Sequence, residues 1–255
     1  MNIIQTTNLT KSYADYTAVS ELNLHIPQGS VYGFLGPNGA GKSTTMKMLL
    51  GLTRPTSGSF TIDGKQYPKD RVEILREVGS FIEAPAFYGN LTGRENLDII
   101  RKILKLPKSA VSDALELVAM IPYKDRLAKR YSLGMKQRLG LAGALIGRPP
   151  ILILDEPTNG LDPVGIHEIR TLIRSLPQKL GCTVLVSSHL LSEIELMADI
   201  VGILNRGHLL FEGTPEELKQ TVKAQGCPTD NLEDTFLALI DADNSHRGAI
   251  QGGAR

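Results

Sequence analysis

A nine-residue stretch, residues 36–44 with the sequence GPNGAGKST, constrains the fold of this chain more than any other feature. It matches the pattern G-x-x-x-x-G-K-[ST] and lies between a short β-rich run, residues 30–35, and a helix-forming run, residues 44–50. Glycines at this spacing let the backbone curl until its N–H groups face one anion at the positive end of the following helix. The chain is therefore predicted to form a strand, a phosphate-binding loop and a helix in succession.

The side chains of this loop indicate a nucleotide as its ligand. Lys42 is expected to reach the β- and γ-phosphates, and the Ser43 hydroxyl to bind Mg²⁺, an ion that prefers oxygen ligands. A plain glycine-rich turn is the alternative, and the fixed spacing and the strand-to-helix context argue against it. The residues predicted to bind nucleotide in this loop are Gly36, Pro37, Asn38, Gly39, Ala40, Gly41, Lys42, Ser43 and Thr44.

A second chemical feature follows the apolar run ILIL at residues 151–154, which ends in Asp155 and Glu156. This run and residues 183–187 (TVLVS) are typical of strands buried on both faces of a parallel sheet. Ligands bind beyond the carboxyl ends of such strands, so both acids are expected beside the phosphate loop. We predict that Asp155 holds Mg²⁺ through water and that Glu156 acts as the general base. A capping pair at a strand-to-turn junction is the alternative.

Composition excludes several classes of protein. The 28 lysines and arginines against 27 aspartates and glutamates give a net charge of +1, so a protein held mainly by nucleic-acid phosphates is not expected. The two cysteines, Cys182 and Cys227, have no metal-ligand spacing and no secretory leader precedes them, which favours reduced thiols in the cytosol. Apolar stretches fall short of the ~20 residues that cross a bilayer. At a membrane, the chain would have to dock to a spanning partner.

The rest of the chain gives weaker signals of secondary structure. Alternating apolar residues predict strands near the N-terminus and again at residues 57–65, and three- and four-residue spacing predicts helices over residues 92–106 and 109–120, with Ser109 as an N-cap. A hairpin is expected at Asn205-Arg206-Gly207. After Gln225, one amphipathic helix over residues 231–240 is expected to precede a flexible glycine-rich tail from residue 248.

The sequence YSLGMKQR at residues 131–138, upstream of the acidic strand, narrows the class, because with the phosphate loop it resembles the ATP-binding cassette (ABC) ATPases. In that family a serine-glycine helix start, the signature motif, caps the γ-phosphate of ATP held by the opposite subunit. The resemblance assigns this role to Ser132 and Gly134. Compared with the common family sequence L-S-G-G-Q, this chain has Leu133 in place of the first glycine and Met135 in place of the glutamine. Taken alone, the stretch could be a plain N-cap with a flexible turn.

Other family motifs fall on single residues of this sequence. The resemblance makes Asp162, in the D-loop that follows the acidic strand, a contact across a dimer interface. It makes His189 the switch histidine, which touches the γ-phosphate and orients the catalytic water; a plain surface histidine is the alternative. Tyr13 is favoured over Tyr16 as the aromatic residue that stacks on adenine, although core or sheet packing would also explain either ring.

Glu83 stands where the family normally has a glutamine whose amide oxygen approaches Mg²⁺. A carboxylate there keeps an oxygen ligand and adds a negative charge beside Asp155 and Glu156, so either the metal is held more tightly or the pKa values of the neighbouring carboxylates rise. An exposed loop acid, shifted by an error of register, is the alternative. Glu83, residues 87–97 and residues 131–138 resemble the ATPase subunits of bacitracin-resistance and lantibiotic self-protection exporters.

The resemblance implies an α/β fold: a RecA-like P-loop NTPase core with an antiparallel β subdomain and a helical subdomain at about residues 84–145. Residues 1–225 are expected to form the ATP-binding domain and residues 226–255 a C-terminal extension. Two copies are expected to sandwich two ATP molecules with Mg²⁺ and to drive a separate membrane permease that exports a peptide antibiotic or similar amphiphile. The subunit would then be cytoplasmic and peripheral on the inner face of the membrane, with no nucleic acid as partner. The alternative is a non-transport ABC ATPase that acts on ribosomes or DNA.

Overall fold

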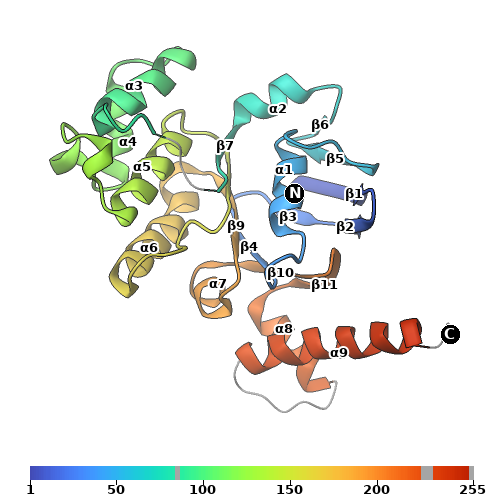
Figure 1. Cartoon of the computed structure of the whole chain (residues 1–255). Coiled ribbons are helices and arrows are strands. Elements are labelled where there is room, and N and C mark those ends of the chain that lie inside the picture. Colours follow the sequence, from blue (N-terminus) through green and yellow to red (C-terminus); the bar gives the residue numbers. More distant parts are fainter. Residues whose placement is uncertain (84–86, 225–231, 253–255) are drawn as a thin grey trace.

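A six-stranded sheet forms the centre of the molecule in the computed structural model, which describes residues 1–83, 87–224 and 232–252 (Figure 1). The strand order is β11-β10-β4-β9-β8-β7, parallel throughout except for β11, which is antiparallel to β10. The strands are β4 (Val31–Leu35), β7 (Val78–Phe81), β8 (Ile151–Leu154), β9 (Thr183–Ser188), β10 (Ile200–Asn205) and β11 (His208–Gly213). This sheet confirms the predicted α/β core, and the β10–β11 hairpin turns where it was expected.

The parallel strands are apolar along their whole length because both faces of the sheet are covered. Along β8, Leu152 and Leu154 enter one hydrophobic core and Ile151 and Ile153 enter the other, and all four are fully buried. Neighbouring β9 alternates in the same way. Successive side chains of a strand point to opposite faces, so a run of four apolar residues supplies two cores at once.

A second, antiparallel sheet forms the N-terminal part of the chain, on the right in Figure 1. Its order is β2-β1-β5-β6, and β3 also pairs with β1. Its strands are β1 (Asn2–Tyr13), β2 (Tyr16–Leu22), β3 (His25–Pro27), β5 (Ser57–Ile62) and β6 (Lys65–Gln66). Helix α1 (Lys42–Leu49) shares one core with both sheets through Met46, Met48 and Leu49. The helix after the phosphate loop is thereby fixed between two layers.

Helices α3 (Gly93–Ile103), α4 (Ser109–Leu117) and α5 (Leu133–Leu145) gather on the opposite side of the central sheet (Figure 1). Short 3₁₀ turns, η1 (Ile121–Tyr123) and η2 (Ala128–Arg130), join the last two. Helix α3 starts with a capping box between Thr92 and Glu95. The predicted N-cap at Ser109 is wrong by one residue: Lys108 is the cap, because the Ala110 N–H already bonds to the Pro107 carbonyl.

The remaining helices cover the sheet or its C-terminal end. They are α2 (Arg71–Glu77), α6 (Pro163–Leu180), α7 (Leu191–Met197), α8 (Pro215–Ala224) and α9 (Leu232–Gly252). Helix α9 extends well past the predicted end at residue 240. Asn205 donates to Asp243 Oδ2 at 2.9 Å and to Asn244 Oδ1 at 3.3 Å. The polar sequence after residue 240 does not predict these tertiary contacts. Cys182 is buried and free, whereas Cys227 lies outside the described residues.

Within the described ranges, no helix combines the length and the apolar character that a bilayer crossing requires.

Candidate nucleotide site

The phosphate loop lies where the sequence predicted, between β4 and α1. Gly41 is the N-cap of α1 with φ of 107°, a left-handed conformation that side chains other than glycine rarely adopt. A Cβ on Gly36 would lie 2.3 Å from the Leu204 carbonyl oxygen, and one on Gly41 would lie 2.5 Å from the Ala18 carbonyl oxygen. These glycines are therefore required by close backbone contacts as well as by the curl of the loop.

Lys42 reaches back over this loop from the first turn of α1. Its Nζ donates to the carbonyl oxygens of Gly36 at 2.6 Å and Pro37 at 3.2 Å, and lies 3.7 Å from Glu156 Oε1. Burial lowers the pKa of the Lys42 ammonium, although the carboxylates of Glu156 and Asp155 act in the opposite direction. The buried Lys42 ammonium is thus held at the phosphate loop by groups of the same chain. Ser43 and Thr44 follow it along α1.

The acids after β8 are fixed by the neighbouring strand. Ser187, on β9, donates through its hydroxyl to Asp155 Oδ1 at 2.6 Å and accepts the Glu156 backbone N–H at 2.9 Å. Asp155 is buried, and its own N–H donates to the Phe81 carbonyl on β7 at 2.8 Å. Glu156 has φ of 46°, a left-handed conformation that turns its side chain away from the direction of the strand. One serine therefore holds both the Asp155 carboxylate and the backbone of Glu156.

Glu156 lies between two basic groups. Its Oε2 is 3.1 Å from His189 Nδ1, and its Oε1 is 3.7 Å from Lys42 Nζ. The Glu156 side chain is 21% exposed and the His189 side chain 38%. The structure thus brings together the phosphate-loop lysine, both strand-end acids and the histidine after β9, as the sequence predicted for this half of the site.

Glu193, on α7, was missed by the sequence analysis. Its buried carboxylate accepts hydrogen bonds from the Thr158 hydroxyl at 2.6 Å and the Ser188 hydroxyl at 3.1 Å. It therefore ties the turn that carries Glu156 to the strand end that carries His189. The available signal was its spacing: Glu193 lies four residues before Met197 and so falls on the helix face that Met197 buries.

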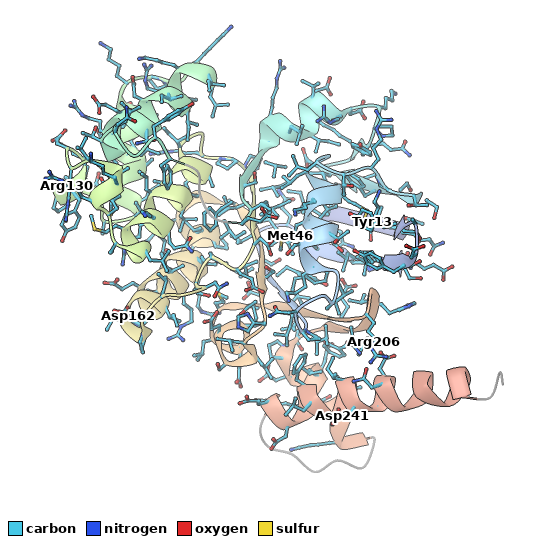
Figure 2. The ribbon with its side chains drawn as sticks, in the orientation of Figure 1. Tyr13, Met46, Arg130, Asp162, Arg206 and Asp241 are labelled. Carbon is cyan, nitrogen blue, oxygen red and sulfur yellow. The ribbon has the colours of Figure 1, made fainter. Side chains whose placement is uncertain are left out.

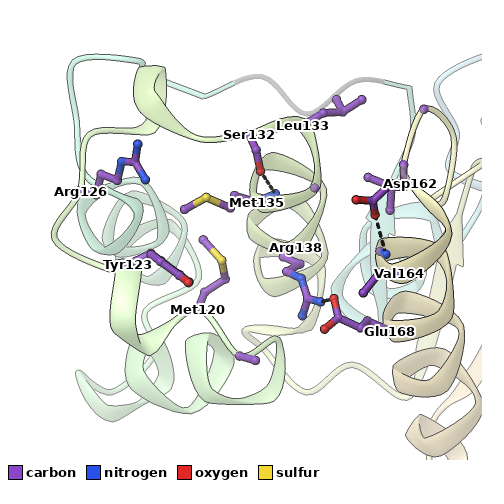
Figure 3. Close-up of a pocket in the computed structure, with 15 residues that line it drawn as sticks. Met120, Tyr123, Arg126, Ser132, Leu133, Met135, Arg138, Asp162, Val164 and Glu168 are labelled. Carbon is purple, nitrogen blue, oxygen red and sulfur yellow. Dashed lines mark hydrogen bonds and ion pairs between the residues drawn. The ribbon is translucent and has the colours of Figure 1, made fainter.

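The signature and D-loop residues lie around a different part of the surface (Figure 3). Ser132 is the N-cap of α5 and accepts the Met135 N–H at 3.3 Å; Asp162 is the N-cap of α6 and accepts the Gly165 N–H at 2.8 Å. Both line a pocket of about 750 Å³, together with Gly134. Among the described residues that line this pocket, none belongs to the phosphate loop. Within one chain, the structure thus uses Ser132 and Asp162 as helix caps.

The predicted adenine-binding aromatic residue lies far from this pocket. In Figure 2, Tyr13 and Asp162 stand on opposite sides of Met46, which belongs to the helix after the phosphate loop. Tyr13 is 42% exposed and stacks on Tyr16, with ring centroids 5.5 Å apart and planes at 24°. The two candidates therefore form one exposed aromatic pair at the β1–β2 turn.

Glu83 follows β7 and is directed to a lysine. Its Oε1 lies 2.6 Å from Lys47 Nζ, and this ion pair lowers the pKa of the Glu83 carboxyl. The Glu83 side chain is 67% exposed, and its backbone has φ of 60°. The ion pair thus directs the Glu83 carboxylate to a side chain of α1 rather than to Asp155 or Glu156. Residues 84–86, which follow it, lie outside the described part of the chain.

The donor set at the strand end suits a hard divalent cation only in combination with a phosphate. Ser43 and Asp155 offer hydroxyl and carboxylate oxygens, the ligand types that Mg²⁺ prefers. Across residues 1–83, 87–224 and 232–252, no group of three or more histidines, cysteines or acids is placed to hold a metal by itself. A cation here would share its ligands with the nucleotide, as is usual for Mg²⁺.

Comparisons with known proteins agree with this geometry. Residues 19–159 match the ABC transporter family. The chain is 52% identical over 219 residues to the bacitracin transport ATP-binding protein BcrA of Bacillus licheniformis, covering 86% of this chain and 72% of that protein. It is 45% identical over 205 residues to the lantibiotic transport ATP-binding protein SrtF of Streptococcus pyogenes, covering 80% and 88%.

Solved structures show the same fold. An ATP-binding subunit of an ABC transporter superposes with a TM-score of 0.81 at 26% identity, covering 93% of this chain and 99% of that one. A dimeric bacterial ABC transporter cassette superposes with a TM-score of 0.75 at 25% identity, covering 83% and 98%. With the family match over more than half of its length, this chain belongs to the ATP-binding subunits of ABC transporters, which are ATPases.

Proposed function

We propose that Glu156 is the general base of ATP hydrolysis in this subunit and that His189 orients the attacking water. The observation that carries this proposal is the position of Glu156 between Lys42 Nζ at 3.7 Å and His189 Nδ1 at 3.1 Å. A carboxylate fixed beside a phosphate-binding lysine can accept a proton from water as the water attacks. The Ser187 hydroxyl accepts the Glu156 N–H and so fixes the backbone that carries this carboxylate.

Nucleotide binding would use groups that are already in position. The backbone N–H groups of residues 36–44 and the N-terminal end of α1 offer positive potential to the β- and γ-phosphates. Lys42 would exchange its bonds to the Gly36 and Pro37 carbonyls for bonds to phosphate oxygens. The exposed ring of Tyr13 offers a stacking surface for adenine at the edge of the antiparallel sheet.

Ser43 and Asp155 are the residues proposed to hold Mg²⁺ beside the nucleotide. The bound ion would neutralise charge on the phosphates and orient them for attack. Glu83 could join these ligands only after leaving Lys47, to which it is bound at 2.6 Å. Its contribution is therefore conditional on a movement of its side chain.

The complete site is proposed to form between two copies of the chain. Ser132, Gly134 and Asp162 line a pocket to which the described phosphate-loop residues do not contribute. A nucleotide that reaches this pocket would therefore have to be bound to the phosphate loop of another copy. The dimeric cassette among the solved relatives supports an assembly of two copies. We propose that the two copies lie head to tail, with the signature of one over the phosphate loop of the other. The start of α5 would then present its N–H groups to the γ-phosphate.

The membrane partner and the transported compound are proposed from the relatives. Named ATP-binding proteins of bacitracin and lantibiotic transport are 52% and 45% identical to this chain. We propose that the subunit binds a separate membrane permease and drives export of a peptide antibiotic or similar amphiphile. In this proposal residues 1–225 are the ATP-binding domain, residues 84–145 its helical subdomain, and residues 226–255 an extension. None of these relatives supports a role on ribosomes or DNA.

The chemical proposal is tested with Glu156→Gln, which keeps the shape of the side chain and removes the base. We expect ATP turnover to fall by about a hundredfold or more, while the variant still binds ATP and forms a stable dimer in Mg²⁺-ATP by light scattering. Glu73→Gln, an exposed acid on α2, is the matched control and should turn over normally. Unchanged turnover in Glu156→Gln would reject the base assignment, and a monomer in ATP would reject the sandwich.

The transport proposal needs a cellular measurement. A strain that expresses this subunit with its permease should resist bacitracin more than a strain that expresses the Glu156→Gln variant with the same permease. If the two strains are equally susceptible to bacitracin, and also equally susceptible to a lantibiotic, peptide antibiotic export is rejected, even where the purified subunit hydrolyses ATP.

A further inference from the structure

Leu133 occupies the signature position at which the family commonly has glycine, and its side chain makes a contact that glycine could not. The side chain is 50% exposed, so the hydrophobic core does not depend on it. Yet Leu133 Cδ2 lies directly against the backbone of Gly160, where an added Cβ would be only 2.8 Å away. A half-exposed leucine at the start of α5 thus covers the D-loop.

Two further contacts join the same end of α5 to the same loop. The Gln137 Nε2 donates to the Asn159 carbonyl at 3.4 Å, and Leu161 Cδ2 lies 3.6 Å from the position of a Cβ on Gly134. Leu133 and Gln137 are four residues apart and so share one face of the helix. Residues 159–161 are therefore packed along the first turns of the signature helix.

The same loop is connected to the proposed general base. The Asn159 N–H donates to the Glu156 carbonyl at 3.1 Å, and the Leu161 N–H donates to the Thr158 carbonyl at 3.2 Å. A displacement of the start of α5 would pass through Leu133 to Gly160 and, through one tight turn, to the backbone of Glu156. This connection lies entirely within one chain.

We propose that Leu133 is a positioning residue that clamps residues 159–161 onto the signature helix, so that signature and D-loop move as one body when they meet the nucleotide of a second copy. This proposal rests on the proposed function, because the clamp would affect ATP hydrolysis only if the nucleotide site is shared by two chains. It predicts that the loss of the leucine side chain loosens the D-loop and weakens the link to Glu156.

The clamp is tested first without nucleotide, by amide hydrogen exchange of the full chain. In Leu133→Ala, the Asn159 and Leu161 amides should exchange at least about fivefold faster than in wild type, because local opening of the loop becomes easier. Leu133→Met keeps a long apolar side chain and should exchange as wild type does. Leu196→Ala, which truncates a 54% exposed leucine on α7, is the matched control and should leave these amides unchanged. Equal exchange in wild type and Leu133→Ala would overturn the clamp.

ATPase kinetics then separate positioning from direct contact with nucleotide. Leu133→Ala should lower kcat by about fivefold or more while KM for ATP stays within about twofold, and Leu133→Met should restore kcat. A change in KM with kcat unchanged would mean that Leu133 contacts the nucleotide, which contradicts the clamp. The hydrogen-exchange experiment uses no ATP, so its result tests the clamp even if the proposed catalytic function is wrong.

A double-mutant cycle isolates the Leu133–Gly160 contact. Gly160→Ala strains the backbone, where φ is +74°, and also places a Cβ 2.8 Å from Leu133 Cδ2. The backbone strain is common to both backgrounds, so only the steric part should disappear when Leu133 is alanine. We expect Gly160→Ala to lower the unfolding midpoint less in the Leu133→Ala background than in wild type. Strict additivity would show that the Leu133 side chain moves freely off Gly160 and does not clamp the loop.

Discussion

The two halves of the nucleotide site are built in different ways. In the phosphate-loop half, Lys42, Asp155 and Glu156 all have partners inside the chain at hydrogen-bond or ion-pair distance. In the signature half, Ser132 and Asp162 cap their own helices and face an open pocket. The first half is organised within one chain, whereas the second, in the proposed two-chain site, is completed by another copy. Substitutions in the two halves should therefore fail differently.

The largest effect is expected for Lys42→Ala in the first half. Its ammonium is buried and aimed at the loop, so its loss should weaken ATP binding by at least about tenfold, as measured by titration calorimetry. Lys102→Ala, a 67% exposed lysine on α3, serves as control. ATP affinity that is equal in Lys42→Ala and wild type would mean that the loop holds phosphate through its backbone alone.

The same lysine gives a pH dependence with a defined sign. Burial lowers the pKa of Lys42 in the folded chain, so its ammonium loses its proton at a lower pH than an exposed lysine does. ATP affinity should therefore be constant below that pKa and fall as the pH rises through it, starting before pH 10.5, the ordinary value for lysine. Lys42→Ala should remove this dependence; its persistence in the variant would assign the titration to another group.

An intermediate effect is expected for Ser187→Ala, which tests the internal organisation of the first half. The variant leaves Asp155 Oδ1 and the Glu156 N–H without the partner that each has at 2.6 and 2.9 Å. Loss of a buried hydrogen-bond partner costs about 1–3 kcal/mol, so the free energy of unfolding in urea should fall by that amount and ATP turnover should fall with it. Ser175→Ala, whose hydroxyl donates to the Leu172 carbonyl of its own helix, is the control. Normal stability of Ser187→Ala would show that the serine does not organise the acids.

A smaller effect on stability is expected for Ser132→Ala in the second half, with a distinct effect on assembly. Loss of the N-cap should lower the free energy of unfolding by about 1 kcal/mol. ATP binding to the single chain should be unchanged, but the ATP-dependent dimer that we expect for the wild type in light scattering should be lost. Ser132→Asp keeps a capping oxygen and adds a negative charge towards the phosphate, so it should regain stability and still fail to dimerise. Dimerisation of either variant would remove Ser132 from the shared site.

The smallest effect is expected for Glu83→Gln at the margin of the first half. Lys47 lowers the pKa of Glu83, so the pair stabilises the fold above the unfolded pKa near 4.5 and loses that contribution as the pH falls through the lowered value. The pair is exposed, so the unfolding midpoint of Glu83→Gln at pH 7 should differ little from wild type, and the difference should vanish in acid. A large loss of Mg²⁺-ATP affinity in this variant would instead place Glu83 among the metal ligands.

The sequence predicted where the residues of the first half lie in the fold, because the signals for their positions are local. Motif spacing placed Lys42, and the apolar runs before Asp155 and after Gly181 predicted the strands that bring the acids and His189 together. Glu193 was missed because its role depends on the packing of α7 against two strand ends, which no spacing motif records. The length of α9 was missed for a similar reason: Asn205 stabilises it through tertiary hydrogen bonds.

The second half of the site could be predicted only through the family resemblance. Ser132 and Asp162 look like ordinary helix caps in the sequence, and within one chain the structure uses them as caps. The packing of Leu133 on Gly160 was invisible because it joins positions whose proximity depends on how α5 lies against the loop before α6. In the sequence, Leu133 is only a departure from the glycine that the family commonly has. In the structure, its side chain covers the D-loop.

The central claim, that each ATP site is shared by two chains, is tested most directly by mixing Lys42→Ala with Ser132→Ala. Each variant alone would have both of its sites damaged, but a mixed dimer would contain one site with an intact phosphate loop and an intact signature. We predict that the mixture hydrolyses ATP well above the sum of the separate variants, provided that both variants fold with near wild-type unfolding midpoints. A mixture no more active than its components would contradict the shared site.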